Sequence, residues 1–328
     1  MLGKASARDA AASEPSILAR PVVLGAGPVG RAVVDELSGR GLTPAVVTRS
    51  GTTVPGASAV AADLTDRVDV ERAIDGATVV FQAAQPPYTR WPQEFPELQR
   101  RIVDAAATAG ATLAVVENLY GYGHVSGPIT AERPLTATTR KGIVRAEMWN
   151  ELERASRVDR LPVVAVRGSD FIGPGVTGSA YGERFVGPIV AGRRAEVLGD
   201  PDARHTVTYV PDLAATLVAA AAAPDAWGRA WLAPNAPAVT QRQLVTLVAA
   251  AAGVEPRLRT VARWQVRLLG RFVPEVREMV ELLYEFDDDL VVDSTETTER
   301  LGVEATPLAD AVAATVAWYR AQADGVSS

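Results

Sequence analysis

The chain has 328 residues, a net charge of −6, no cysteine and only two histidines, His124 and His205. Its length suits one large domain or two that share a core, and 48% apolar with 22% charged residues is typical of a folded globular protein. The missing cysteines exclude disulfides, thiolate metal sites and cysteine nucleophiles, and two isolated histidines argue against a metal site. The acidic balance gives no bulk field for nucleic acid or an anionic membrane and leaves room only for a local basic patch. We therefore expect no metal, nucleic acid or membrane partner.

Residues 1–19 mix Ala, Ser and charged side chains and lack the apolar segment of a signal peptide. We predict a poorly ordered leader over this stretch. No apolar run reaches the length of a membrane span. These observations predict a cytoplasmic protein.

From Arg20 onward, short apolar runs alternate with helix-like stretches. The apolar runs lie at 21–25, 45–48, 59–61, 78–81, 113–116 and 162–166, and the helix-like stretches at 28–37, 66–74, 95–109 and 140–157. Continuous apolar strands separated by helices are typical of a parallel sheet that is covered on both faces. The pattern predicts a doubly wound α/β core over residues 20–168.

After Gly168 the alternation loosens, and we predict a smaller substrate-side lobe over 169–328 that returns some elements to the core. Helices are expected near 211–223, 240–252 and 262–285 and after Pro307. Four large side chains recur at helical spacing in the third of these and predict core packing, with an apolar lid as the alternative: Trp264, Phe272, Met279 and Tyr284. The acidic run Asp287–Asp289 is interpreted as a solvated turn, because it lacks a spaced calcium-ligand loop.

The strongest chemical signal is the segment VVLGAGPVGRAV, residues 22–33. Gly25, Gly27 and Gly30 form a G-x-G-x-x-G pattern between the first predicted strand and the first predicted helix. Such glycines permit a tight turn, close approach of backbone amides to a pyrophosphate, and close packing of helix on strand. Pro28 and Val29 open the helix, whose N-terminus favours an anion. We predict a dinucleotide-binding loop of the Rossmann type.

The residues after the second strand indicate which dinucleotide binds. NAD-preferring sites usually carry an acid there, whereas this chain has Arg49, which can form charge-assisted hydrogen bonds with a 2′-phosphate. Arg31 is a second candidate contact. We therefore predict NADP(H) rather than NAD(H), with a solvated surface role for Arg49 as the alternative. Asp63 is placed either to meet the adenine edge or to cap the next helix.

Together, these segments resemble the extended or atypical branch of the short-chain dehydrogenase/reductase superfamily, the NAD-dependent epimerase/dehydratase family. The resemblance runs from Pro21 to about Arg320 and rests on the glycine loop and on the following segments: Asp63-Leu64, Phe81-Gln82-Ala83-Ala84, Tyr122-Gly123, Arg167–Pro174, Tyr209–Asp212, Glu299–Gly302 and Val316–Tyr319. It implies cofactor contacts from Leu64, Ala83 and Ala84. It also implies a small organic substrate.

The catalytic positions depart from the family pattern. Where the family carries Ser or Thr four residues before the Tyr of its Tyr-Gly pair, this chain has Asn118. Where it carries Tyr-x-x-x-Lys, the best match is Lys141 followed by Arg145. An ammonium can act as an acid, whereas Arg145 cannot shuttle protons and can only hydrogen-bond a ribose or phosphate. The nearby Tyr120 is the candidate for the role of the missing tyrosine, with plain packing as the alternative.

Other side chains in the loops at the carboxyl edge of the predicted sheet are candidates for proton transfer or substrate contact. Glu117 and His124 are further proton carriers, although we expect His124 to be a loop residue and His205 to be structural or substrate-side. Tyr88 and Trp91 predict either an aromatic wall over the substrate or a packed proline turn. The remaining candidate substrate contacts are Gln85, Tyr122 and Phe171, with packing and loop shape the leading interpretation for Tyr122.

The sequence thus favours an NADP(H)-dependent oxidoreductase or epimerase that acts on a small molecule without the usual Tyr-x-x-x-Lys pair. Two alternatives stay open, because a fold does not guarantee its usual chemistry: a non-redox isomerase or cyclase, and a non-catalytic dinucleotide sensor. The helix predicted near 140–157 is well charged, which leaves both a monomer and a homodimer as expectations.

Overall fold

A seven-stranded parallel sheet forms the centre of the molecule. The computed structural model describes residues 16–326. The strands, in spatial order, are β11 (Arg229–Leu232), β6 (Val163–Gly168), β5 (Thr112–Asn118), β4 (Val79–Gln82), β1 (Pro21–Leu24), β2 (Ala45–Thr48) and β3 (Ser58–Ala61). This order reverses direction at β1, so the crevice beside β1 and β4 is where a doubly wound sheet binds its ligand. The predicted fold class is confirmed.

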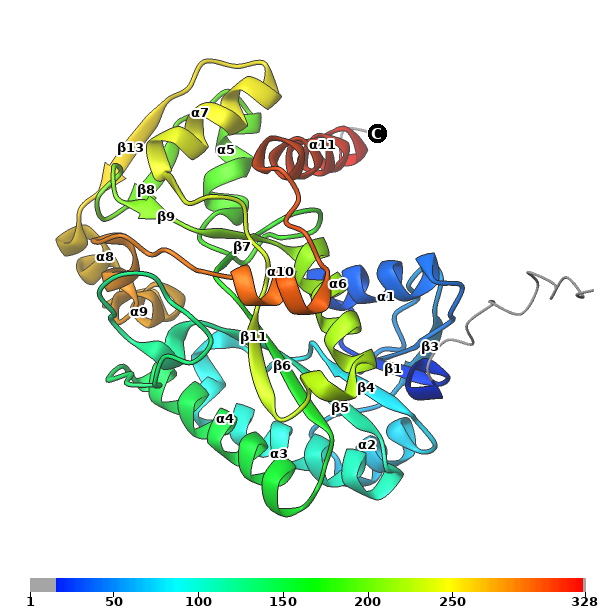
Figure 1. Ribbon diagram of the computed structural model, residues 1–328. Coiled ribbons are helices and arrows are strands. Elements are labelled where there is room, and N and C mark those ends of the chain that lie inside the picture. The colour runs from blue at the N-terminus through cyan, green and yellow to red at the C-terminus, as the bar shows by residue number, and fades with distance from the viewer. Residues whose placement is uncertain (1–15, 327–328) are drawn as a thin grey trace, which may run out of the picture.

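Helices cover both faces of this sheet (Figure 1). The helices α1 (Pro28–Gly39) and α6 (Val210–Ala222) pack together on one face. The other face carries α2 (Arg67–Ile74), α3 (Trp91–Ala109) and α4 (Arg140–Val158). Because side chains alternate along a strand, Val23 joins the apolar cluster under α1 and α6 while Val22 and Leu24 join the cluster under α2, α3 and α4.

The leader predicted over residues 1–19 is described only at its C-terminal end. Its first 15 residues lie outside the described part of the chain. Ser16–Leu18 forms a 3₁₀ turn instead of an unstructured segment, because Leu18 is buried in the apolar cluster under α1 and α6.

The C-terminal lobe adds small sheets and helices above the carboxyl edge of the central sheet (Figure 1). Its strands are β7 (Asp170–Ile172), β8 (Ala195–Leu198), β9 (Arg204–His205), β10 (Val207–Tyr209), β12 (Val239–Thr240) and β13 (Leu258–Val261), paired β7–β10, β8–β13 and β9–β12. Its helices include α5 (Gly187–Val190), α7 (Gln241–Ala252), α10 (Thr295–Leu301) and α11 (Leu308–Val326). A third apolar cluster, centred on Tyr181 and Phe185, holds the lobe together.

The continuous helix predicted over 262–285 is wrong. The segment forms α8 (Arg263–Leu269), α9 (Pro274–Val280) and a 3₁₀ turn, Leu283–Phe286. Pro274 causes the break, because proline disfavours a helical residue before it, and Val273 is extended with φ −115° and ψ 107°. Trp264 and Phe272, predicted to be core, are 64% and 78% exposed.

The acidic run at 287–289 is partly solvated, with Asp288 and Asp289 exposed, and each of its side chains also contacts a basic side chain. Asp287 pairs with Arg263, Asp288 with His124, and Asp289 with Arg204. Within the described residues, no cluster of acids and histidines is suited to a metal ion, and no helix is long and apolar enough to span a membrane.

Candidate active site

The glycine loop has the geometry that its spacing predicts. A Cβ added at Gly30 would lie 2.0 Å from the carbonyl oxygen of Gly25, so only glycine lets α1 approach β1 this closely. Gly25 has φ +99°, which L side chains rarely adopt. No side chain caps α1, and the space in front of the Cα atom of Gly27 is open. The first-turn amides of α1 are therefore left for an anionic ligand.

The carboxyl end of β4 lines the same loop. The amide of Ala83 donates to the carbonyl of Leu24, and the backbone of Ala84 lies against Gly25. This contact places Ala83 and Ala84 beside the glycine loop. Leu64, which follows β3, is half-buried against the apolar cluster under α2 and α3.

At the end of β2, Arg49 is exposed and makes no ion pair with the described side chains. Asp63 lies close enough for the charge of Arg49 to help hold its pKa below the usual value, after the larger effect of two hydrogen bonds from Thr65. Asp63 does not cap α2; Asp66 does, by accepting from the amide of Asp69. The Nε atom of Arg31 donates to the carbonyl of Ala26, which ties it to the glycine loop.

Three aromatic side chains meet at the edge of the sheet, where β4 and β5 end. The hydroxyl of Tyr88 donates to that of Tyr120 at 3.1 Å, and the ring of Trp91 packs edge-on to Tyr88 at 4.8 Å. Trp91 is buried and its Nε1 atom donates to the carbonyl of Pro86, so it belongs to the core, whereas Tyr88 is half-buried. The side chain of Asn118 accepts from the amide of Tyr120 and fixes the turn that presents this tyrosine.

Burial raises the pKa of both Tyr120 and Tyr88. Desolvation raises the pKa of Tyr120 well above 10, and the neighbouring Tyr88 and Glu285 reinforce the shift. Desolvation likewise raises the pKa of Tyr88. Both phenols are therefore neutral at pH 7 and suited to donating a hydrogen bond rather than to acting as bases.

Lys141 is fully buried at the start of α4 and lies beside this pair. Its Nζ atom is 4.6 Å from the centre of the Tyr88 ring. The same atom forms ion pairs with two carboxylates of the α9 segment, with Glu278 and, at 3.0 Å, with Glu281. Lys141 thus joins α4 to α9 across the predicted catalytic region.

Arg145, one turn further along α4, is buried and lies against the ring of Phe95. Its Nη2 atom donates to the carbonyl of Val116 and to Glu117, 3.1 and 3.2 Å away. Glu117 also accepts from the Nε atom of Arg167 at 2.9 Å, and Arg167 donates to the hydroxyl of Tyr122. These groups are engaged with one another, and Tyr122 is fully buried, which agrees with the packing interpretation.

The C-terminal lobe brings in acids that sequence reasoning missed. Glu285 is only 6% exposed, and its side chain makes no hydrogen bond within the described part of the chain. Desolvation, and after it the negative charge of Asp170, raises the pKa of Glu285 well above 4.5. The carboxylate of Asp170 accepts a hydrogen bond from the Nε2 atom of His205 at 2.9 Å, and the His205 ring stacks on Phe286 at 5.2 Å. His205 is buried and lies next to these acids.

Of the predicted substrate contacts, Gln85 is exposed and Phe171 is half-buried. Phe171 packs against Gly168 in the apolar cluster under α1 and α6. His124 is exposed and hydrogen-bonds Asp288, as expected of a loop residue.

The family model for the NAD-dependent epimerase/dehydratase family matches residues 22–231. The chain belongs to this family. The resemblance drawn from the sequence is confirmed, and so is the prediction of an enzyme that uses NAD or NADP. No curated protein sequence gives a significant match.

Solved structures share the fold. A structure of gox2253 has a TM-score of 0.76 and 21% identity, and the match covers 93% of this chain and 98% of that one. DesIV, a dTDP-glucose 4,6-dehydratase from Streptomyces venezuelae with NAD bound, has a TM-score of 0.75, 20% identity and coverage of 93% and 98%. MoeE5 in complex with UDP-glucose and NAD has a TM-score of 0.73, 21% identity and coverage of 93% and 99%.

Proposed function

We propose that this enzyme is an NADP(H)-dependent oxidoreductase or epimerase of a small organic molecule. The observation that carries the choice of NADP(H) is Arg49, an exposed guanidinium at the end of β2 that forms no ion pair with a described carboxylate. A free arginine matches a phosphate through paired charge-assisted hydrogen bonds. The glycine loop and the uncapped N-terminus of α1 fit the pyrophosphate. When bound, the nicotinamide supplies or accepts a hydride.

Binding of the two dinucleotides to Arg49→Ala tests the choice. We expect the unmodified protein to bind NADPH roughly tenfold more tightly than NADH, since a charged hydrogen bond contributes about 1.5–3 kcal/mol. The substitution should weaken NADPH binding by a similar factor and leave NADH binding almost unchanged. Arg193→Ala, at another exposed arginine without a described ion pair, serves as the control. Equal or tighter NADH binding by the unmodified protein would overturn the preference.

For proton transfer we propose Tyr120, with Tyr88 as its hydrogen-bonded relay. The 3.1 Å contact between the two hydroxyls and the nearby ammonium of Lys141 support this choice. A neutral phenol can donate its proton to a developing alkoxide, and the second phenol can replace it. Asn118 holds the turn that carries Tyr120. Arg145 keeps a positioning role, because its Nη2 atom is engaged with Glu117 and Val116.

The substrate test compares Tyr120→Phe with the unmodified protein on a panel of carbonyl compounds and nucleotide-sugars, the latter chosen because DesIV and MoeE5 are named for or bound to such molecules. We expect at least a tenfold loss of turnover and little change in NADPH binding. Normal turnover in Tyr120→Phe would refute the proton-transfer proposal. Tight NADPH binding without hydride transfer to any panel member would favour a dinucleotide sensor instead.

A further inference from the structure

The helix α8 carries its largest apolar side chains on the face that points away from the protein. Val266 is buried, whereas Trp264 and Leu268 are 64% and 48% exposed. At 100° per residue, Trp264 and Leu268 lie nearly opposite Val266 on the helix. Leu269 and Phe272 extend the exposed apolar surface, at 50% and 78%. We call the four residues Trp264, Leu268, Leu269 and Phe272 the apolar ridge.

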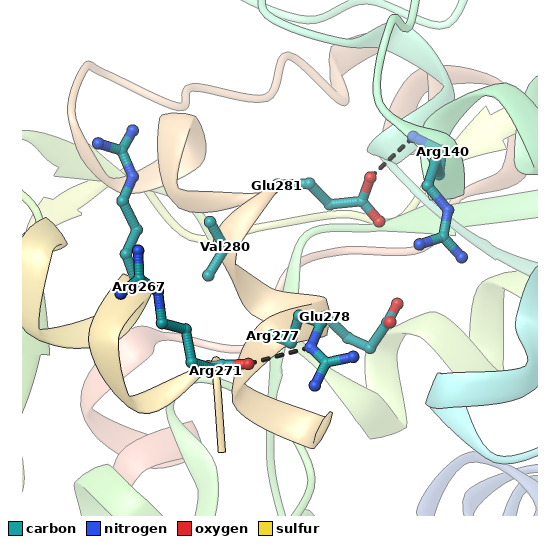
Figure 2. Close-up of a pocket in the computed structure, with 8 residues that line it drawn as sticks. Arg140, Arg267, Arg271, Arg277, Glu278, Val280 and Glu281 are labelled. Atoms are coloured by element: carbon teal, nitrogen blue, oxygen red, sulfur yellow. Dashed lines mark hydrogen bonds between the residues drawn. The ribbon is translucent and has the colours of Figure 1, made fainter. Parts of the chain in front are cut away.

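Arginines that lack acidic partners lie beside this ridge. Arg267 and Arg271 flank it, and both line a cavity of about 530 Å³ whose other basic residues are Arg140 and Arg277. Figure 2 shows Arg267 and Arg271 on the α8 side of the cavity and Arg140 across from them. No ion pair joins any of these four guanidinium groups to a carboxylate whose side chain the structure describes.

The two acids of the cavity do not cancel this positive charge. Glu278 and Glu281 both bind the ammonium of Lys141, which lies behind them and is fully buried. Among the described side chains that line the cavity, four arginines therefore accompany two carboxylates that already pair with Lys141, in a protein whose net charge is −6. The basic patch is local, as the sequence alone allowed.

Exposed aromatic and aliphatic side chains flanked by arginines match the interface of an anionic bilayer. Trp and Phe insert at the level of the lipid headgroups, and arginines beside them bind lipid phosphates. A bilayer that carries negative charge matches both at once.

We propose that the apolar ridge and its flanking arginines are a peripheral docking surface for anionic phospholipid bilayers, in which the ridge enters the headgroup region and the arginine-lined cavity accepts a lipid phosphate. The proposal uses the local basic patch that the sequence left open beside its acidic net charge. The surface is coupled to the candidate active site, because α9 lies between the cavity and Lys141. Docking would bring the active site close to the membrane.

The test is co-sedimentation of the full chain with vesicles of phosphatidylcholine, with or without about 30% phosphatidylglycerol. We expect binding to the anionic vesicles, roughly tenfold weaker binding to the neutral ones, and loss of binding at high salt. Tryptophan emission should shift to the blue on binding, because Trp264 is the one exposed tryptophan among the six, all of which lie in the described residues.

Three variants separate the contributions. Trp264→Ser/Phe272→Ser should abolish both binding and the blue shift, and Arg267→Glu/Arg271→Glu should reduce binding to anionic vesicles at least tenfold. Arg193→Glu/Arg194→Glu, a matched change at two exposed arginines on another loop, should bind like the unmodified protein. Unchanged melting temperatures will show that all three variants fold.

The proposal is overturned if neither kind of vesicle binds, if both bind equally, or if the control variant loses as much binding as Arg267→Glu/Arg271→Glu. A dimer that Trp264→Ser/Phe272→Ser dissociates, in a protein that does not bind vesicles, would assign the ridge to a second copy of the chain instead. Size-exclusion chromatography with light scattering distinguishes that result.

Discussion

Replacing Glu117 by Gln removes the negative charge between two buried guanidinium groups. The carboxylate accepts from Arg145 at 3.2 Å and from Arg167 at 2.9 Å, and the three residues are only 4%, 4% and 3% exposed. Breaking a buried ion pair costs about 3–5 kcal/mol, because the remaining charge cannot reach water. Gln keeps one acceptor, so we take the lower end, about 3 kcal/mol. For a chain of this size that corresponds to a fall of roughly 5 °C or more in melting temperature.

Urea unfolding at pH 7, followed by circular dichroism, measures the loss. Glu97→Gln is the matched control, because Glu97 pairs with Arg100 and Arg101 at the surface, where such pairs contribute about 0–1 kcal/mol. A loss for Glu117→Gln no larger than that of the control would refute the conclusion that Glu117 neutralises the two arginines. It would return Glu117 to the proton carriers that the sequence left open.

Three further predictions follow from the same structure. Lys141→Met removes the cation that pairs with both Glu278 and Glu281, so amide hydrogen exchange over 274–286 should rise at least tenfold while exchange in β5 stays slow. Equal protection of this segment in the variant and the unmodified protein would contradict this role of Lys141. Burial raises the pKa of Glu285, so the folded state keeps its proton and the free energy of unfolding should fall as pH rises above about 4.5, by up to about 1.4 kcal/mol per pH unit. Glu285→Gln should reduce the difference in this free energy between denaturation curves at pH 5 and pH 8. An unchanged difference would exclude Glu285 as its source. Gly30→Ala places a Cβ 2.0 Å from the carbonyl oxygen of Gly25, so it should lower stability and weaken NADPH binding at least tenfold in calorimetry. The control Gly39→Ala, whose added Cβ has no atom within 4 Å, should leave NADPH binding unchanged. Unchanged NADPH affinity in Gly30→Ala would disprove the close packing.

The sequence by itself determined the core of the fold and the dinucleotide loop. Both follow from local patterns in the sequence. Apolar strands alternate with helices, and Gly25, Gly27 and Gly30 occur at the spacing that a helix packed closely against a strand requires. These patterns depend on neighbours in the chain, so they can be read without knowing the tertiary contacts. The family follows from the same segments.

Local patterns failed where distant segments meet. The helical spacing at 262–285 predicted core packing for Trp264 and Phe272, but Pro274 divides the segment, and Val266 is the residue of α8 that faces inward. The spacing of apolar residues predicts which side chains share one face of a helix, but it does not predict what that face contacts.

The surroundings of the candidate site were decided by tertiary structure alone. Glu278 and Glu285 lie more than 130 residues from Lys141 and Tyr120, and nothing in the local sequence marks them as neighbours. The same holds for Arg145. Its spacing from Lys141 predicted a contact with a ribose, whereas in the folded chain its guanidinium donates to Glu117. The reason is physical: a buried charge must find its counter-charge in three dimensions, and chain folding, not sequence distance, decides which one is within reach.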